Sequence, residues 1–346
     1  MDIAIRPFEL ELASPLETAD GRIDRREGFL VRVEDGDDSG LGEATPLPGW
    51  TESYEACRDA LERVVSIAGE DGATDTLLAA CEDAPAARHG LALALADLHA
   101  RRELAPLYRQ LDGCERVDYV PVNATIGDGS PAETADAAGE AVADGYDTIK
   151  LKVGVRDVAA DLERVRRVRE AVGPEIELRV DANGAWTPAE ARTAIEGLAD
   201  EDVALLEQPL PAEDLAGHAT LRGSGVAIGL DEGLLECGID TVLGADAADA
   251  IVVKPMALGG PDRAREVAAW ALECDVVPIV TTTIDAVVAR TGAVHLAASL
   301  PDVPACGLAT ADLLATDLGP DPAPVIDGEV VVPGGNGLGV SGVWDE

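Results

Sequence analysis

The sequence predicts an α/β protein built around a β/α barrel, with a smaller domain in front of it. From about residue 119, short apolar, β-branched runs alternate with Ala-, Glu- and Arg-rich stretches of helical length. Strands that alternate with helices form a parallel sheet. No Gly-x-Gly-x-x-Gly segment follows the first of these runs, which disfavours a dinucleotide-binding doubly wound sheet. The length of 346 residues suits a barrel plus a smaller domain.

The elements are predicted in chain order as follows. Strand-like runs at 3–10 and 28–33 precede a weakly charged helix at 86–101 that is expected to be buried. Helices at 158–172 and 261–274 are typical of the second half, where Pro131, Pro188 and Pro261 mark first turns. The barrel strands are expected at 120–126, 148–153, 176–180, 204–207, 227–230, 250–253 and 276–280, with a weak eighth near 306–310. The predicted divisions are 1–118, 119–310 and a tail, 311–346, that packs back on the N-terminal part.

The charge is strongly acidic, with 66 Asp and Glu against 26 Lys and Arg and a formal net charge of −40. The acid is spread along the chain, which is typical of a folded, halophilic protein whose self-repulsion is screened by concentrated salt. A basic partner would call for a local acidic patch. Nucleic acid and anionic membrane are excluded as partners by the same charge.

Six widely spaced cysteines without a Cys-x-x-Cys pair, and only four histidines, argue against a zinc site and for a reduced cytoplasm. The N-terminus has no signal-peptide apolar region, and no apolar run is long enough to span a bilayer. We therefore expect a cytoplasmic protein; the sequence carries no signal for its oligomeric state.

The chain contains three lysines, Lys150, Lys152 and Lys254, and all of them lie at the ends of predicted strands. Buried lysine is costly unless it is paired, and its pKa shifts readily, so it can serve as a base. The alternatives are a lysine that extends from a strand end to solvent, or a buried ion pair. Lys150 and Lys152 point to the same face and need not share a role.

Three further predicted strands end in carboxylates: Asp181, Glu207 and Asp231. Each alone could be a helix N-cap. In a barrel, however, the C-terminal strand ends converge on one face, where three carboxylates would repel one another and take up protons. A hard divalent cation resolves this conflict, and Mg²⁺ fits, with Mn²⁺ as a possible substitute.

This constellation predicts proton abstraction next to a carboxylate. A metal that holds a substrate carboxylate stabilises the charge that develops when the adjacent C–H loses its proton. Two lysines on opposite faces of the carbon permit racemisation; alternatively, one acts as the base while the other stabilises. The alternative outside the enzymes is a catalytically inactive scaffold that binds a partner. The complete set of lysines and carboxylates disfavours this alternative.

At these residues the chain resembles the enolase superfamily, muconate-lactonising subgroup, over nearly its whole length. The resemblance implies an α+β capping domain and a modified (β/α)7β TIM-type barrel. It implies Asp181, Glu207 and Asp231 as Mg²⁺ ligands and a small-molecule carboxylate as substrate. It implies Lys152 and Lys254 as the acid/base pair, a family chemistry that general accounts of enolase-type sites already describe. Lys150 and Asn183 would contact the substrate.

Within the subgroup, segments 42–50, 179–186 and 307–313 are most similar to the o-succinylbenzoate synthases of menaquinone biosynthesis. This likeness implies syn dehydration of 2-succinyl-6-hydroxy-2,4-cyclohexadiene-1-carboxylate through a metal-stabilised enediolate. Where that family shows a Ser pair followed by Ile-Glu, this chain has Thr282, Thr283 and then Ile-Asp, so the threonines are expected to bind the substrate tail. Plain β propensity and turn capping are the alternatives. An N-succinylamino acid racemase or a dipeptide epimerase is the alternative activity, but Asp312 stands alone where an Asp-x-Asp would grip an α-ammonium.

Overall fold

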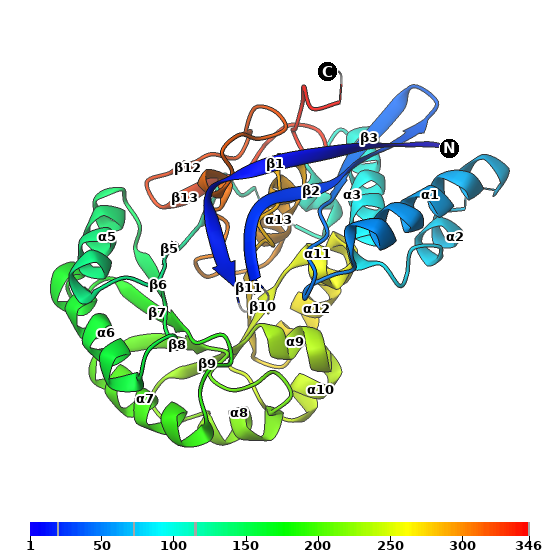
Figure 1. Ribbon diagram of the computed structural model, residues 1–346. Coiled ribbons are helices and arrows are strands. Elements are labelled where there is room, and N and C mark those ends of the chain that lie inside the picture. The colour runs from blue at the N-terminus through cyan, green and yellow to red at the C-terminus, as the bar shows by residue number, and fades with distance from the viewer. Residues whose placement is uncertain (19–20, 72, 114–115, 345–346) are drawn as a thin grey trace.

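The computed structural model describes residues 1–18, 21–71, 73–113 and 116–344. Its centre is a curled sheet of seven parallel strands with helices along its outer side (Figure 1). The prediction of an α/β barrel with a capping domain is therefore confirmed. The strands follow chain order across the sheet: β5 (Ala124–Ile126), β6 (Thr148–Lys152), β7 (Glu177–Asp181), β8 (Val203–Glu207), β9 (Ala227–Leu230), β10 (Ala250–Val253) and β11 (Val277–Val280).

The weak eighth strand predicted near 306–310 is reduced to two isolated bridges that close the barrel. Cys306 pairs with Val122 on the β5 side, and Gly307 pairs with Thr281 on the β11 side. The backbone N–H of Gly307 donates to the carbonyl of Val280 at 2.9 Å. This short segment thus joins the two edges of the seven-stranded sheet.

The prediction of one strand over 120–126 is wrong, because the chain changes pairing partner there. β4 (Tyr119–Pro121) lies in a separate antiparallel sheet with β12 (Val325–Ile326) and β13 (Glu329–Val331). Of this run, only Ala124–Ile126 forms a strand of the seven-stranded sheet. Pro121 has no N–H to donate to a ladder, and its carbonyl accepts the N–H of Cys306 at 2.8 Å.

The outer helices begin with the signals that the sequence carries. Pro131, Pro188 and Pro261 occupy first turns, and Ser130 and Thr187 form capping boxes with glutamates three residues later. These helices follow their strands in order: α5 (Pro131–Ala143), α6 (Val158–Val172), α7 (Pro188–Asp200), α8 (Leu215–Leu221), α9 (Glu232–Cys237), α10 (Ile239–Gly244), α11 (Pro255–Leu258), α12 (Pro261–Glu273) and α13 (Val287–Ser299).

The N-terminal part is a three-stranded antiparallel sheet packed on a buried helix. Gly42 and Gly90 allow the sheet and the helix to meet, because a Cβ on Gly42 would lie 1.9 Å from the carbonyl oxygen of Gly90. The sheet contains β1 (Asp2–Thr18), β2 (Gly21–Asp35) and β3 (Asp38–Ala44); the helices are α1 (Tyr54–Asp71), α2 (Thr74–Ala79), α3 (Pro85–Arg102) and the short α4 (Leu107–Gln110).

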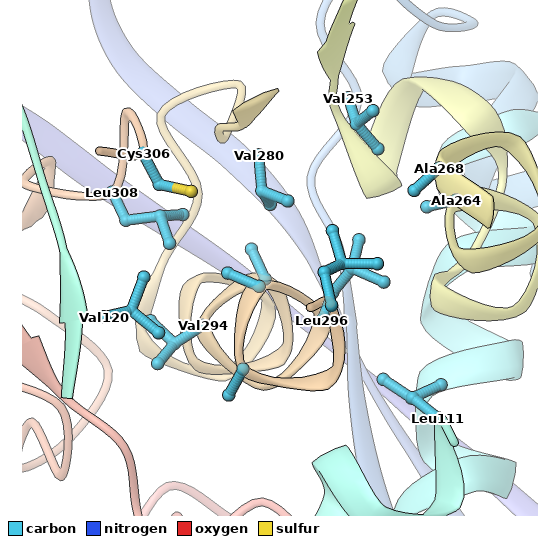
Figure 2. Close-up of a cluster of buried hydrophobic side chains, with 14 of the residues drawn as sticks. Leu111, Val120, Val253, Ala264, Ala268, Val280, Val294, Leu296, Cys306 and Leu308 are labelled. Atoms are coloured by element: carbon cyan, nitrogen blue, oxygen red, sulfur yellow. The ribbon is translucent and has the colours of Figure 1, made fainter. Parts of the chain in front are cut away.

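Helix α13 is buried along its whole length, unlike the outer helices of the barrel. Figure 2 shows Val294 and Leu296 of this helix among side chains from several elements, including Val120, Val280 and Leu308. The capping domain covers the helix from the other side, through contacts with α3, α4 and β3. The N-terminus of α13 and the loop in front of it therefore lie between the two domains.

The C-terminal segment runs back over the first part of the chain. The N–H of Leu338 donates to Asp97 of α3 at 2.7 Å, and Arg6 of β1 lies over the ring of Trp344. The short 3₁₀ turn Ala311–Leu313 lies against β1. Among the described residues, no helix is long and apolar enough to cross a membrane. The five described cysteines are free thiols; Cys114 lies outside the described residues.

Candidate active site

The lysines and carboxylates singled out in the sequence meet at the C-terminal ends of neighbouring barrel strands. Lys152 of β6 is the register partner of Asp181 of β7, which in turn pairs with Glu207 of β8. Asp231 directly follows β9, and Lys254 directly follows β10. The strand order thus places a lysine-bearing strand on each side of the three that carry carboxylates.

Each lysine forms a short ion pair with a carboxylate. The Nζ of Lys150 lies 2.6 Å from Glu207 and 3.0 Å from Asp181, so it bridges the two. Lys152 donates to Asp181 at 2.6 Å and to the amide oxygen of Asn183 at 2.8 Å. On the opposite side, Lys254 donates to Asp231 at 2.6 Å.

Burial and crowding shift the proton affinities of this cluster. Burial, followed by the negative charge of Asp181, raises the pKa of Glu207 to about 8. Burial acts in the same direction on Asp181, but Lys150 and Lys152 outweigh it and hold the pKa of Asp181 well below its usual range. Burial would lower the pKa of Lys150, yet the carboxylates of Asp181 and Glu207 raise it above its ordinary value. The cluster thus places the three carboxylates beside three lysines, and burial next to Asp181 makes ionisation of Glu207 unfavourable.

The donor atoms of this cluster are carboxylate oxygens, the type that a hard divalent cation prefers. Asp231 Oδ1 and Glu232 Oε2 are buried without any hydrogen-bond partner, which costs free energy unless a cation or water satisfies them. Within the described ranges, no group of three or more His, Cys, Asp and Glu side chains is arranged to hold a metal ion; the lysine ammonium groups contact the carboxylates instead. The assignment of Asp181, Glu207 and Asp231 as Mg²⁺ ligands stays a prediction, supported by the unsatisfied oxygen of Asp231.

Gln208 holds the backbone around Asp231 in place. It is fully buried, and its Oε1 accepts the N–H groups of Asp231 and Gly233, each at 3.0 Å. Its Nε2 donates to the carbonyl of Leu210 at 3.0 Å and faces the ring of the buried His218. Neither Gln208 nor Glu232 was predicted from the sequence. Each directly follows one of the carboxylates, Glu207 or Asp231, and this adjacency was the available signal.

Lys254 is covered by a side chain from the capping domain. Its Nζ lies 3.2 Å from the centre of the Trp50 ring, within the range of a cation–π contact. A small pocket beside them is lined by Trp50, Asp231, Leu234, Leu235, Val252, Lys254, Ala257 and Leu258. The capping domain therefore contributes directly to the surroundings of this lysine.

The other predicted substrate contacts lie on the same rim. Thr282 and Thr283 are buried just beyond the end of β11. The hydroxyl groups of Thr282 and Thr310 lie 3.1 Å apart, and Thr283 donates to Asp285 at 2.6 Å. Asn183 uses its oxygen for Lys152 and its Nδ2 for Glu232 at 2.9 Å. The substrate contacts assigned to these residues remain predictions.

Comparison with known proteins places the chain in a family. Residues 133–345 match the enolase C-terminal domain-like family. The chain belongs to the enolase superfamily. Residues 3–98 match the N-terminal domain of MenC. The resemblance that the strand-end residues suggested is thereby confirmed at the level of the superfamily.

Relatives in the enolase superfamily have more than one activity. The L-Ala-D/L-Glu epimerase of Bacillus subtilis (strain 168) is 30% identical over 344 residues, which cover 96% of this chain and 93% of the relative. The o-succinylbenzoate synthase of Enterobacter sp. (strain 638) is also 30% identical, over 336 residues that cover 94% of this chain and 97% of the relative. The crystal structure of a dipeptide epimerase from Enterococcus faecalis V583, complexed with Mg and the dipeptide L-Leu-L-Tyr, superposes with a TM-score of 0.88 at 27% identity and covers 99% of both chains.

Proposed function

We propose that the chain is an o-succinylbenzoate synthase, a hydro-lyase that uses Mg²⁺ to dehydrate 2-succinyl-6-hydroxy-2,4-cyclohexadiene-1-carboxylate. The observation that carries the proposal is the position of Lys152 and Lys254 on strands either side of Asp181, Glu207 and Asp231. Residues 1–118 would cap the site, 119–310 would form the barrel, and 311–346 would return to the cap.

A bound Mg²⁺ would lower the energy of the negative charge that forms on the substrate carboxylate as the adjacent carbon is deprotonated. Asp181, Glu207 and Asp231 would hold it. Lys150, which bridges two of these carboxylates, would then face the substrate carboxylate as a fixed cation. This arrangement separates the task of charge stabilisation from the task of moving the proton.

Lys152 would move the proton. As a neutral amine it would take the proton from the carbon next to the carboxylate, leaving the electron pair on the substrate. The same Nζ would then return that proton to the departing hydroxyl group as the C–O bond breaks, so that water leaves and the ring becomes aromatic. The 2.8 Å contact with Asn183 would orient the amine, and Lys254 would remain a cation on the opposite face.

Two contacts favour dehydration over epimerisation. First, Lys254 lies against the face of the Trp50 ring, a contact that suits a stabilising cation on the face opposite Lys152. Second, the segment after Gly307 presents the hydroxyl of Thr310 to Thr282, and Asp312 is the single acid of 307–313. A hydroxyl pair suits an uncharged or anionic substrate tail better than the α-ammonium of a dipeptide.

Epimerisation or racemisation is the second candidate function. Two lysines that flank the carboxylates could exchange a proton on both faces of a carbon, and relatives that act as epimerases are as similar in sequence as the synthase. Dipeptides and N-succinylamino acids are then the substrate classes to test.

The deciding experiment compares turnover of the cyclohexadiene carboxylate with solvent-deuterium exchange into both enantiomers of an N-succinylamino acid and into L,L-dipeptides. It should be run with Mg²⁺ in molar KCl. We expect dehydration, with exchange of the amino-acid substrates slower or absent. A protein that fails to dehydrate the diene yet exchanges both enantiomers is a racemase or epimerase, and the lyase proposal is then wrong.

A further inference from the structure

Lys152 is tied to the rest of the barrel through its own backbone. Its side chain is 36% exposed, the highest value among the three lysines of the site. Its carbonyl oxygen, however, accepts a 2.9 Å hydrogen bond from Nη1 of Arg164 on helix α6. Arg164 is one of the largest fully buried side chains of the described chain.

Asp161 holds the next peptide group along the chain. Its Oδ2 accepts the N–H of Gly154 at 2.7 Å, and its Oδ1 accepts from Arg164 at 3.0 Å. Gly154 has a φ of +92°, and a Cβ there would lie 2.8 Å from that of Ala185. The buried ion pair therefore binds the chain both at Lys152 and two residues beyond it.

Arg164 also anchors this turn to the preceding strand and helix. Its Nη2 donates to the carbonyl of Gly127 after β5 at 3.1 Å, and its Nε lies 3.4 Å from the hydroxyl of Thr134 on α5. The guanidinium thus links the ends of β5 and β6 to helices α5 and α6. A buried ion pair is a weak source of net stability, since apolar residues of similar size often replace it without loss. Its directed hydrogen bonds to the turn that carries Lys152 point to a different role.

We propose that Arg164 and Asp161 are positioning residues for Lys152, which fix the two peptide groups that follow it and so aim its Nζ at the substrate carbon. The proposal rests on the proposed function of Lys152 as the base. Rates of well-oriented proton transfers fall steeply with displacement; about 1 Å costs on the order of 10²-fold. Loss of the clamp should therefore lower kcat and leave the substrate KM nearly unchanged.

The test uses the double variant Asp161→Asn/Arg164→Met in the Mg²⁺-loaded protein. It removes both buried charges together, so that neither is left unpaired, and it keeps an amide oxygen near Gly154. We expect kcat to fall roughly 10- to 100-fold, with KM within about threefold of the wild-type value and Mg²⁺ affinity retained. Arg169→Met is the matched control: Arg169 lies on the same helix and donates to backbone carbonyls at Gly173, Ile176, Glu201 and Asp202. Its loss should change stability without changing kcat.

A second readout is independent of turnover. Because the chain has three lysines, ¹⁵N-lysine labelling gives a small set of Nζ signals, which the Lys152→Arg variant assigns. In the double variant the Lys152 signal should shift and broaden, and the Lys254 signal should not.

If the double variant fails to fold, Arg164→Lys replaces it, because an ammonium cannot reach Lys152, Gly127 and Asp161 together. The same changes in kcat and in the Lys152 signal are expected. A wild-type kcat together with a wild-type Lys152 signal, in whichever variant folds, overturns the proposal. If the wild type does not dehydrate the diene, the proposed function fails, and the Lys152 signal still decides the positioning claim.

Discussion

Replacing Glu43 by glutamine should remove a pH dependence of stability that originates between the two domains. Glu43 of β3 is fully buried and accepts the N–H groups of Ala286 and Ala289 at 2.8 and 2.9 Å, at the start of α13. Burial, followed by the charge of Asp285, raises its pKa from 4.5 to about 7. Since one pKa unit corresponds to about 1.4 kcal/mol, this rise corresponds to about 3 kcal/mol.

The sign follows from proton linkage. Between pH 4.5 and about 7, Glu43 keeps its proton in the folded state and loses it in the unfolded state. The folded protein therefore loses stability through this side chain as pH rises through that window, and the loss is complete above it. Glutamine does not titrate, so the free energy of unfolding of the wild type should fall by about 3 kcal/mol relative to Glu43→Gln between pH 4.5 and 8.

Urea unfolding at fixed KCl and EDTA, across this pH range, measures the difference between the two proteins. The difference cancels the titration of groups that both proteins share, including the buried histidines. Glu62→Gln on the exposed face of α1 is the control, and its curve should run parallel to that of the wild type. Parallel curves for Glu43→Gln as well would refute the reasoning about burial at this junction.

The remaining predictions concern the site and the surface. Lys152→Ala should lower kcat for dehydration by at least about 10²–10⁴-fold, and a near wild-type rate in this variant would exclude the proposed mechanism. Lys254→Arg should keep a trace of activity that Lys254→Ala lacks. Gln208→Leu should weaken Mg²⁺ binding roughly 10- to 100-fold in calorimetry, because the backbone of Asp231 loses its support; unchanged affinity would contradict this. Melting temperature should fall as KCl is reduced from molar to dilute, because the net charge of −40 is then screened over about 30 Å instead of about 3 Å; a melting temperature insensitive to KCl would argue against salt adaptation.

Periodicity in the sequence was sufficient to predict most of the barrel. The runs at 227–230 and 250–253 are strands β9 and β10 with the same boundaries, and 158–172 is helix α6. The signal failed where pairing depends on distant segments. Val120 and Ala124 lie in one apolar run, but they join different sheets because Glu329–Val331 competes for the first part of it.

The candidate site was predictable in its membership but not in its contacts. Lys152, Asp181 and Glu207 could be chosen because polar residues at the ends of apolar strands are unusual and costly. Arg164 and Glu43 gave no comparable signal: an arginine in an amphipathic helix and a glutamate at a strand end are ordinary on a surface. Their importance depends on which segments cover them.

By itself, the sequence determined the alternation of strands and helices, the chain's acidity, and the strand ends at which lysines and carboxylates stand. These properties depend on residue type and local period, which the chain carries at every position. Only the tertiary structure decided that Lys150 bridges Asp181 and Glu207, that Trp50 covers Lys254, and that Arg164 holds the backbone of Lys152. Those contacts join residues from different strands, helices or domains. Their free energies depend on how deeply the side chains are buried and how far apart they lie, and both are set only when the barrel has closed and the cap has packed against it.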